Sequence, residues 1–537
     1  MEQLRSTANK SIYNIGFNQP YEGKLGAGLL DMKTALEGIN SPGLRMIETE
    51  LTDGDDDIFS EGDEIYLGVE LFNYLNSLTD IDVQITSLTT NVEVTNGSWN
   101  VASIATSSGT DNFDTPFTLK VNSVNEFDQT VTLKLTATSS VNNYVYEQFI
   151  DFQINPSYVN VQVNRLKTTI SKNGLFGYTD YFQTNGLGFQ IDSSQSVIFE
   201  GGLMIGHRTD NLTQVVDRVR SNDLFDRDFW EDAVITRQVP SGDQAYFAKG
   251  SFTDTSANQD EIGLIIEQKV WAFDKAGHQN YIILEYEIEN VSDQDLSDVA
   301  VGLFADWDIV DARENKAAVA YGKRLGYVYN TGSKEITAGI QALSRYTFNS
   351  YMIDNVGGGN GGIDLFDEEG FTTGDKYTAL TNERMKAGQG DEGNDVIEVT
   401  SVKGIVLPEN SRISIAFALH AGQNIEEVLQ SADSAYVEFY GYLPGQNLAQ
   451  PFVLTNTWPN PTSGAATIAL DLRDQSTLFV EVINPMGRFV DSWETSTLYP
   501  GYNELTLNLS GLHSGVYFVR LSKDDFSQIF PITLQQQ

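Results

Sequence analysis

The densest group of side chains able to do chemistry is an acidic segment at residues 53–64. Counted from its first residue, carboxylates stand at positions 1, 3, 5, 9 and 12, as Asp53, Asp55, Asp57, Glu61 and Glu64. Calcium takes about six to eight oxygen ligands, and this spacing can wrap a flexible loop around one ion. Ile58 stands where a helix–loop–helix calcium hand needs glycine, and no helix is expected before the segment. We therefore expect a structural calcium in a loop that opens a β-sandwich, with a solvated acidic turn as the alternative.

A second group of carboxylates, Asp306, Asp308 and Asp311, follows an apolar run. On a strand, Asp306 and Asp308 would share a face with their backbones about 6.6 Å apart, since each residue rises about 3.3 Å. Such a pair can serve as acid and base on a glycosidic bond, or bind a cation together with Asp311. The alternative is a strand end at which the aspartates cap a loop. The acidic loop 391–395 is treated in the same way, as a solvated loop or a cation site.

Histidine is too sparse to support zinc or a serine nucleophile. The chain has four histidines, at positions 207, 278, 420 and 513, and no two lie within ligand spacing in the sequence. A serine nucleophile needs an adjacent base that a third group holds in place. His513 and Ser514 are neighbours, but they fall in a turn that explains them better. We predict no catalytic residue in this chain.

The charge balance limits the partners. The 537 residues include 74 acidic and 33 basic side chains, for a formal net charge of −41. This charge repels phosphate backbones and anionic lipid, so we expect neither nucleic acid nor a membrane surface as partner. There is no cysteine, which excludes disulfides and thiolate metal sites. Apolar runs reach only about seven residues, too short for a transmembrane segment.

Alternation of apolar and polar residues predicts a mainly β protein built from tandem antiparallel β-sandwiches. Residues 44–156 are expected to form an immunoglobulin- or fibronectin-like sandwich, and residues 157–440 one large sandwich that serves as an accessory domain. In the large sandwich, residues 270–273 should pair with a strand around 282–289 through the turn 274–277. The only clear later helix is expected at 424–435, where apolar residues recur at helical spacing.

Residues 452–537 have the turns and short strands of a further immunoglobulin-like sandwich. An Asn-Pro-rich opening and three later glycines mark its turns, at Pro459, Asn460, Pro461, Gly487, Gly501 and Gly515. The order of these turns and of the closing run Gly-Val-Tyr-Phe-Val-Arg-Leu resembles the C-terminal sorting domain of the type IX secretion system. The resemblance implies export by the type IX machinery and a secreted or outer-surface location. The alternative is an ordinary terminal sandwich.

Residues 1–40 are expected to form two short helices on either side of a turn with regularly spaced glycines. Three stretches carry a second resemblance, at residues 4–8, 21–28 and 35–36, and together they are similar to the end of a subtilisin-like (subtilase) serine peptidase domain. The resemblance implies a C-terminal remnant of an α/β catalytic domain, whose aspartate, histidine and nucleophile motifs would lie upstream. None of those motifs occurs here. The first residues also lack the apolar core of a signal peptide, so we expect that Met1 is not the natural start.

These observations favour the non-catalytic C-terminal accessory and export portion of a secreted subtilisin-like peptidase, with an upstream peptidase domain as partner. The first alternative is a secreted cell-surface adhesin or carbohydrate-binding protein, with an extracellular protein or polysaccharide as ligand, that uses exposed tyrosines and tryptophans (24 and 6 in the chain) as stacking platforms. The second is a glycosidase or lyase that uses Asp306 and Asp308.

Overall fold

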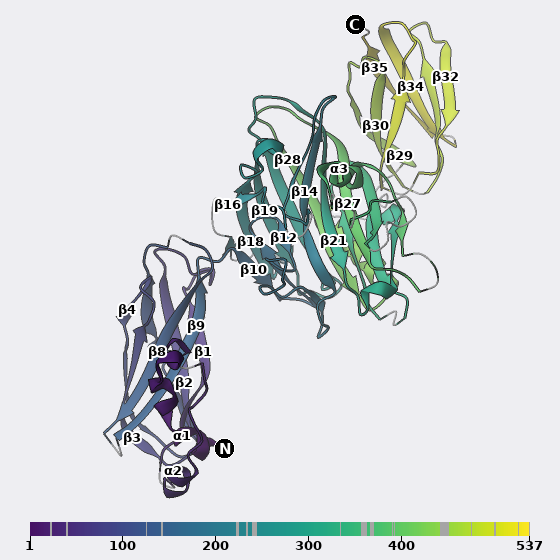
Figure 1. Ribbon diagram of the computed structural model, residues 1–537. Helices are drawn as coiled ribbons and strands as arrows, with labels where there is room; N and C mark the ends of the chain where they lie inside the picture. The colour runs from purple at the N-terminus through teal and green to yellow at the C-terminus, as the bar shows by residue number, and fades with distance from the viewer. Residues whose placement is uncertain are drawn as a thin grey trace. The chain divides into compact units, whose positions relative to one another are not determined.

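In this computed structural model, the structure describes residues 1–21, 24–38, 41–124, 126–140, 143–221, 225–231, 235–238, 244–332, 335–355, 362–365, 370–388, 390, 392–440, 450–473, 475–498, 501–524 and 526–535. The chain divides into two compact units, residues 1–157 with 234–239, and residues 158–233 with 240–537. The protein is mainly β, with antiparallel sheets throughout both units (Figure 1), as the alternation predicted. No helix in the described ranges is long and apolar enough to cross a membrane.

The first unit begins with short helices and continues as a two-sheet sandwich. The helices are α1 (Glu2–Ser6), η1 (Lys10–Asn14), η2 (Gly16–Tyr21) and α2 (Met32–Glu37). One sheet has the order β1 (Leu44–Thr52), β2 (Glu64–Asn73), β7 (Phe117–Val121) and β4 (Val92–Asn96), with β6 (Ser108–Asp111) on β2. The other has the order β5 (Ser98–Ile104), β3 (Leu78–Ser87), β8 (Gln129–Ser139) and β9 (Tyr144–Ile154). Apolar side chains of both sheets form one core, in which Leu67 and Leu133 are fully buried. The short strand β17 (Thr236–Gln238) also belongs to this unit.

The second unit contains two large sheets. The first has the order β10 (Tyr158–Val161), β11 (Leu166–Ser171), β12 (Leu175–Phe176), β14 (Ile198–Arg208), β21 (Leu296–Trp307), β27 (Val396–Leu407) and β25 (Thr347–Asp354), with β13 (Phe189–Ile191) on β11 and β15 (Thr213–Asp217) on β14. The second has the order β16 (Trp230–Glu231), β18 (Tyr246–Thr253), β19 (Leu264–Ala272), β20 (Tyr281–Asn290), β28 (Arg412–Gly422), β24 (Thr337–Ala342), β23 (Leu325–Asn330), β22 (Asn315–Ala320) and β26 (Lys386–Ala387). Helices and 3-10 turns complete the unit, as η4 (Asn258–Asp260), η5 (Ala312–Glu314), η6 (Tyr321–Lys323), α3 (Thr373–Thr381) and α4 (Ile425–Tyr440).

Polar side chains connect these two sheets across their shared interior. The Gln268 side chain of β19 donates to the carbonyl of Ser171 at the end of β11 (2.8 Å). The buried Glu398 carboxylate of β27 accepts from the Ile340 amide of β24 (3.1 Å) and from the Trp307 indole of β21 (3.0 Å). Burial raises the pKa of Glu398 to about 7, although these donors oppose the shift. The layers are therefore joined by specific hydrogen bonds as well as by apolar packing.

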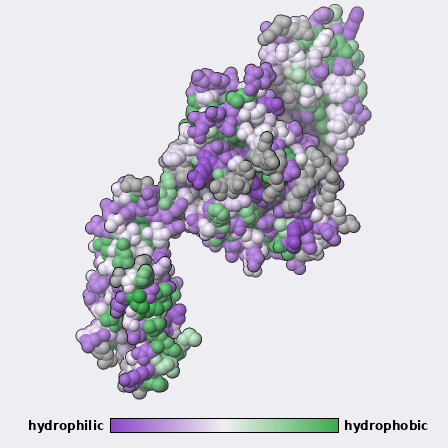
Figure 2. Space-filling model, in the orientation of Figure 1, coloured by the Kyte–Doolittle hydropathy of each residue, from purple (hydrophilic) through white to green (hydrophobic). Residues whose placement is uncertain are grey.

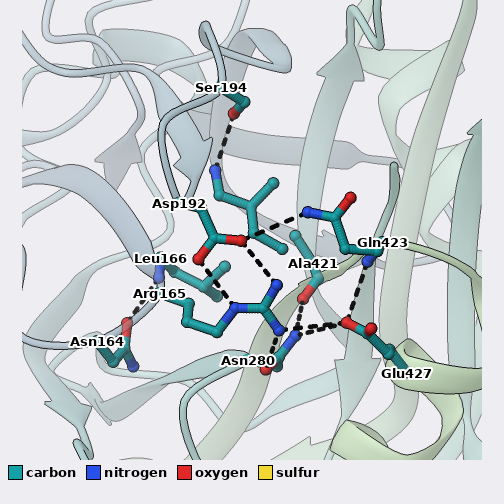
Figure 3. A network of polar contacts seen from close by, with 10 residues as sticks. Asn164, Arg165, Leu166, Asp192, Ser194, Asn280, Ala421, Gln423 and Glu427 are labelled. Carbon is teal, nitrogen blue, oxygen red and sulfur yellow. Dashed lines mark hydrogen bonds and ion pairs between the residues drawn. The ribbon is translucent and has the colours of Figure 1, made fainter. Parts of the chain in front are cut away.

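Figure 3 shows a charged network that also connects the sheets, centred on Arg165. The guanidinium makes a two-point contact with Asp192 after β13 (2.9 and 2.7 Å). It also reaches Asn280 before β20 (3.1 Å) and Glu427 in α4 (3.2 Å). Hydrogen bonds from Arg165 lower the pKa of Asp192. Since the groups in this network bind one another, we read it as a structural clamp between loops and α4.

The hairpin expected near residue 275 is present, since β19 pairs with β20, but its connection is longer than the expected turn 274–277, with Ala272 opposite Ile282. In β20, Leu284, Tyr286 and Ile288 are buried and alternate with partly exposed glutamates. The later helix also exists, but it runs longer than expected, as α4 at Ile425–Tyr440. The expectation of a single later helix is wrong, since α3 forms at Thr373–Thr381, where three threonines and a glycine mask the helical pattern.

Helix α3 lies directly on the nine-stranded sheet, as Figure 1 shows near β14, β21 and β27. The close approach depends on glycines in two of these strands. A Cβ at Gly206 would lie 2.9 Å from Tyr377, and a Cβ at Gly302 would lie 2.7 Å from both Leu380 Cδ2 and Ser401 Cβ. Both distances are shorter than those of real Cβ contacts. The absence of a side chain at the two glycines therefore lets α3 pack this closely against the sheet.

The tail has its own two sheets and core. One sheet has the order β29 (Phe452–Trp458), β30 (Ala465–Leu472) and β33 (Gly501–Asn508), and the other β32 (Phe489–Glu494), β31 (Phe479–Ile483), β34 (Gly515–Lys523) and β35 (Phe526–Leu534). Seventeen buried side chains among the described residues form a single apolar cluster, Ile468 and Val519 among them.

We predict that Gly302→Ala destabilises the second unit by about 1–3 kcal/mol, because the added methyl group overpacks the seat of α3. The measurement is the denaturation midpoint of the full chain. The matched control is Gly374→Ala in α3 itself, where the nearest atom to an added Cβ is 3.7 Å away. That control should be neutral or slightly stabilising. Equal losses in the two variants would contradict the packing argument.

Candidate cation site

The last residues of β21 and β25 and the first residues of β27 lie side by side at one end of the nine-stranded sheet. β21 and β25 both run antiparallel to β27, so their last residues lie beside its first residues. In this register Asp306 pairs with Ile397, and Asp354 pairs with Val396. The arrangement brings Asp306 and Asp308 of one connection together with Asn355 and Asp395 of two others.

The carboxylates of Asp306, Asp308 and Asp395 form a compact group. One oxygen of each lies within 4.8 Å of the others. Asp306 is only 2% exposed, and the other two are half-buried. The Asn355 side-chain amide donates to Asp306 Oδ2 (3.4 Å) and to Asp395 Oδ1 (3.2 Å). Its backbone amide also donates to the Asp395 carbonyl (2.8 Å), which fixes the two loops together.

Arg220 supplies positive charge on one side of this group. Its Nε donates to Glu200 Oε2 of β14 (2.6 Å), and its Nη2 contacts Asp306 Oδ2. The guanidinium also lies 5.4 Å from the Phe199 ring centre and 5.8 Å from that of Phe304. Rings and carboxylates together hold this arginine in one orientation.

One guanidinium is too little charge for the four carboxylates gathered here. Burial raises the pKa of Asp306 to about 8; Arg220 opposes the shift, and Asp395 and Asp308 add to it. Burial, reinforced by Asp395, also raises the pKa of Asp308 to about 6. Burial raises the pKa of Asp395 as well. The site is therefore electrostatically short of positive charge.

The sequence analysis assigned Asp306 and Asp308 to one candidate site and Asp395 to a separate acidic loop. Asp311 is not part of the group: it caps η5 and binds Arg313 through its own carboxylate (3.0 and 2.8 Å). Asp395 takes its place, from the acidic loop that was considered separately. Asp391 of that loop lies outside the described residues.

A second acidic group in the same unit is neutralised by a lysine side chain. Asp217, Asp226 and Asp228 also have oxygens within 4.8 Å of one another. The ammonium of Lys376, on α3, binds Asp217 (2.8 and 2.9 Å) and Asp226 (2.7 Å). Burial would lower the pKa of Lys376, but the aspartates outweigh burial and hold it above its usual value. A lysine thus occupies the position that a metal ion would take.

The five carboxylates of the 53–64 segment lie in separate local contacts. Asp53 accepts from the amides of Asp55 and Asp57 (2.8 and 3.1 Å) in a turn. Glu61 accepts from the Val124 amide (3.2 Å), and Glu64 from the Tyr66 hydroxyl (2.6 Å). In the described part of the chain, the acidic groups compact enough to share an ion do not include these residues. Calcium binding by this loop stays a prediction.

Histidine has a structural role where its contacts are defined. His420 is fully buried between Ser431 (2.8 Å) and Gln341 (3.2 Å), and burial lowers its pKa to about 3. His207 contacts the Ser297 carbonyl (2.7 Å). The two compact acidic groups found among the described residues contain no histidine, so their chemistry is that of oxygen ligands.

The turn residues of the tail hold its strands in place. Asn460 accepts from the Thr533 amide (2.9 Å) and donates to the Pro531 carbonyl (3.2 Å), which ties the Asn-Pro segment to β35. Gly487 has φ +78° in the turn between β31 and β32, and Gly501 has φ +91° at the start of β33. Gly515 begins β34, opposite Leu534. Pro459 and Pro461 each follow a cis peptide bond.

Residues 456–532 match the family described as "Secretion system C-terminal sorting domain". The chain therefore carries a type IX sorting domain at its C-terminal end. It is a secreted or outer-surface protein, and the type IX machinery is its export partner. No curated protein sequence matches the chain.

Solved structures resemble the chain only distantly. A polysaccharide lyase has a TM-score of 0.27 at 9% identity, over 71% of this chain and 47% of that one. A heparan sulfate lyase HepC mutant from Pedobacter heparinus has a TM-score of 0.21 at 7% identity, over 73% and 44%. Native alpha-2-macroglobulin from Escherichia coli, from domain MG7 to its C-terminus, has a TM-score of 0.17 at 13% identity, over 32% and 24%. This chain thus spans less than half the length of these proteins, and at such scores the likeness carries no functional argument.

We predict that Lys376→Met destabilises the second unit by about 3–5 kcal/mol, because it leaves buried carboxylates without a cation. In the variant the carboxyl pKa values should rise further above those of the unfolded chain. A carboxyl that holds its proton more tightly when folded loses stability as the pH rises from about 4 toward its folded pKa. The loss should therefore be larger at pH 8 than at pH 5, as measured by denaturation of the full chain. Lys386→Met, at an exposed position in β26, is the control. A loss independent of pH would contradict the charge argument.

Proposed function

We propose that this chain is the non-catalytic C-terminal accessory and export portion of a secreted subtilisin-like serine peptidase. The observation that carries the proposal is an apolar surface on residues 1–38, the segment that resembles the end of a peptidase domain. The sorting domain at the other end accounts for export. The sandwiches between them would hold the peptidase at a distance from its point of attachment.

The segment is attached to the first sandwich through polar groups. Arg5 lies 5.5 Å from the ring centre of Tyr146 in β9 and donates to the Leu44 carbonyl. Lys10 binds Glu147 of β9 (3.0 Å). Gln3 reaches back to the Ala35 carbonyl at α2 (3.1 Å), which holds the two helices together. At these points the segment contacts the sandwich through charged side chains.

Its apolar side chains lie on the outside instead. Leu29, Leu30, Met32 and Leu36 are 50%, 64%, 53% and 72% exposed. Ala35 is the one buried hydrophobic residue among those described in 1–38. Figure 2 shows hydrophobic side chains gathered on this face of the first unit, where Figure 1 places the segment. A contiguous apolar surface of this kind marks a face that normally packs against another domain.

The proposed occupant is the peptidase domain encoded upstream, of which residues 1–40 would be the last part. The catalytic residues would then belong to that domain, and this chain alone should not hydrolyse peptides. The arrangement of Asp306 favours this reading over a glycosidase. It is buried and bound by Arg220, so its carboxyl is not placed to protonate a glycosidic oxygen at the surface.

We predict that a separately produced peptidase domain, from the in-frame segment upstream, co-purifies with this chain. Leu30→Glu and Leu36→Glu together should abolish the association, because each places a charge in the apolar face. The measurement is co-purification, together with casein cleavage by the complex. Folding of the variant is checked by circular dichroism.

The control is Phe182→Glu, a charge placed at another exposed apolar side chain, in the second unit. It should leave the association intact. An upstream segment without a peptidase domain, or an association unaffected by the two leucine changes, would contradict the proposal.

We predict that removal of residues 452–537 retains the rest of the protein inside the cell envelope, because the sorting domain is the part that the export machinery recognises. The measurement is immunodetection in the medium, at the cell surface and in the periplasm of a host with type IX secretion. Normal export of the truncated protein would show that the address lies elsewhere in the chain.

A further inference from the structure

Two buried oxygen atoms at the meeting point of β21, β25 and β27 have no hydrogen-bond partner among the described residues. They are Asp306 Oδ1 and Asn355 Oδ1, on side chains of residues that are 2% and 4% exposed. Buried polar atoms in folded proteins are almost always paired, and an unpaired one calls for an explanation such as an ion. Asp306 belongs to the carboxylate group with Asp308 and Asp395. Asn355 lies beside that group and turns its amide nitrogen toward Asp306 and Asp395.

Positive charge from the described part of the chain does not pair these two oxygens. Arg220 reaches Asp306 through Oδ2 and is otherwise committed to Glu200. Neighbouring Asp354 has its own partner in Arg384 (2.8 Å). The acidic group around Asp217 is neutralised by Lys376. At Asp306, Asp308 and Asp395, three carboxylates lie close together, and the Asn355 amide donates to two of them, Asp306 and Asp395.

We propose that Asp306, Asp308 and Asp395 bind one calcium ion, with the side-chain oxygen of Asn355 as a fourth protein ligand. The ion joins three connections that are far apart in the sequence, and its role is structural. This proposal concerns a different part of the chain from the proposed peptidase partner and does not depend on it.

The geometry suits calcium. Calcium–oxygen distances are about 2.3–2.6 Å, so two ligands on opposite sides of the ion lie about 4.6–5.2 Å apart. The three carboxylates already lie within 4.8 Å of one another, so little movement is needed. Magnesium binds at about 2.0–2.1 Å with near-octahedral geometry, which requires a tighter cage.

The half-buried side of the site completes the coordination. Asp308 and Asp395 keep part of their surface open to solvent, so water molecules can fill the remaining positions. The Asn355 amide now presents its nitrogen to two carboxylates. A half-turn of that amide exchanges nitrogen for oxygen and directs Oδ1 to the ion. All four protein ligands are then hard oxygen atoms, and a secreted protein meets calcium in its surroundings.

The test compares the full chain with the double variant Asp308→Asn, Asp395→Asn. These residues are half-buried, so the variant is expected to fold; circular dichroism checks this. Bound calcium is measured by equilibrium dialysis with elemental analysis, and thermal transitions are recorded in calcium and in chelator. We expect the variant to lose one equivalent of calcium, to bind at this site at least 30-fold more weakly, and to lose the calcium-dependent rise of the second unit's transition.

Two controls separate this site from other acidic groups. Asp311→Asn lies in the same stretch of sequence but outside the group, and it should keep the bound ion. Asp53→Asn with Asp57→Asn removes the candidate loop of the first unit and should leave the second unit's calcium response unchanged. The proposal is overturned if the Asp308/Asp395 variant keeps its calcium and its thermal shift, if the unaltered chain shows no calcium response in its second unit, or if magnesium acts equally well.

Discussion

Negative charge enclosed in the large sandwich must be met by cations or by hydrogen-bond donors, and much of the local structure follows from this constraint. The chain carries a net charge of −41, and several of its carboxylates are buried at strand ends. Lys376 comes from a helix to meet Asp217, and Arg220 comes from a loop to meet Glu200 and Asp306. In each case the cation lies on a connection, and the acids lie in or beside strands. The loops are therefore positioned by the acids that they neutralise.

The strands were the most predictable part of the fold. Alternation predicted the buried face of β20, because apolar and charged residues alternate along that strand. The motifs of the tail were equally local, since each glycine or proline lies in a connection or at the first residue of a strand. Helix α3 was missed because its polar sequence is stabilised by what it contacts: Gly206 and Gly302 make room for it, and Lys376 anchors it.

Only part of the candidate cation site could be predicted from the sequence, because strand pairing between distant segments brings its residues together. Asp306 and Asp308 are two residues apart, so the strand repeat predicted that they share a face, although β21 ends at Trp307 between them. Asp395 lies nearly ninety residues later and joins them only through the pairing of β21 with β27. Asp311 is closer in sequence, yet it turns away to cap η5. The position of Arg220 beside these carboxylates could not be predicted, because a lone arginine in a loop is normally a surface residue.

The seat of α3 has a consequence for the order in which the large sandwich is assembled. The helix contacts β14, β21, β25 and β27, so its seat is complete only after strands from distant parts of the chain have paired. Until then the aspartates at 217, 226 and 228 have no ammonium beside them and stay hydrated. Docking of one nine-residue helix would then expel water and supply the counter-charge in the same step. We therefore regard α3 as the closing piece of the domain, and its detachment as the natural first event when the domain opens.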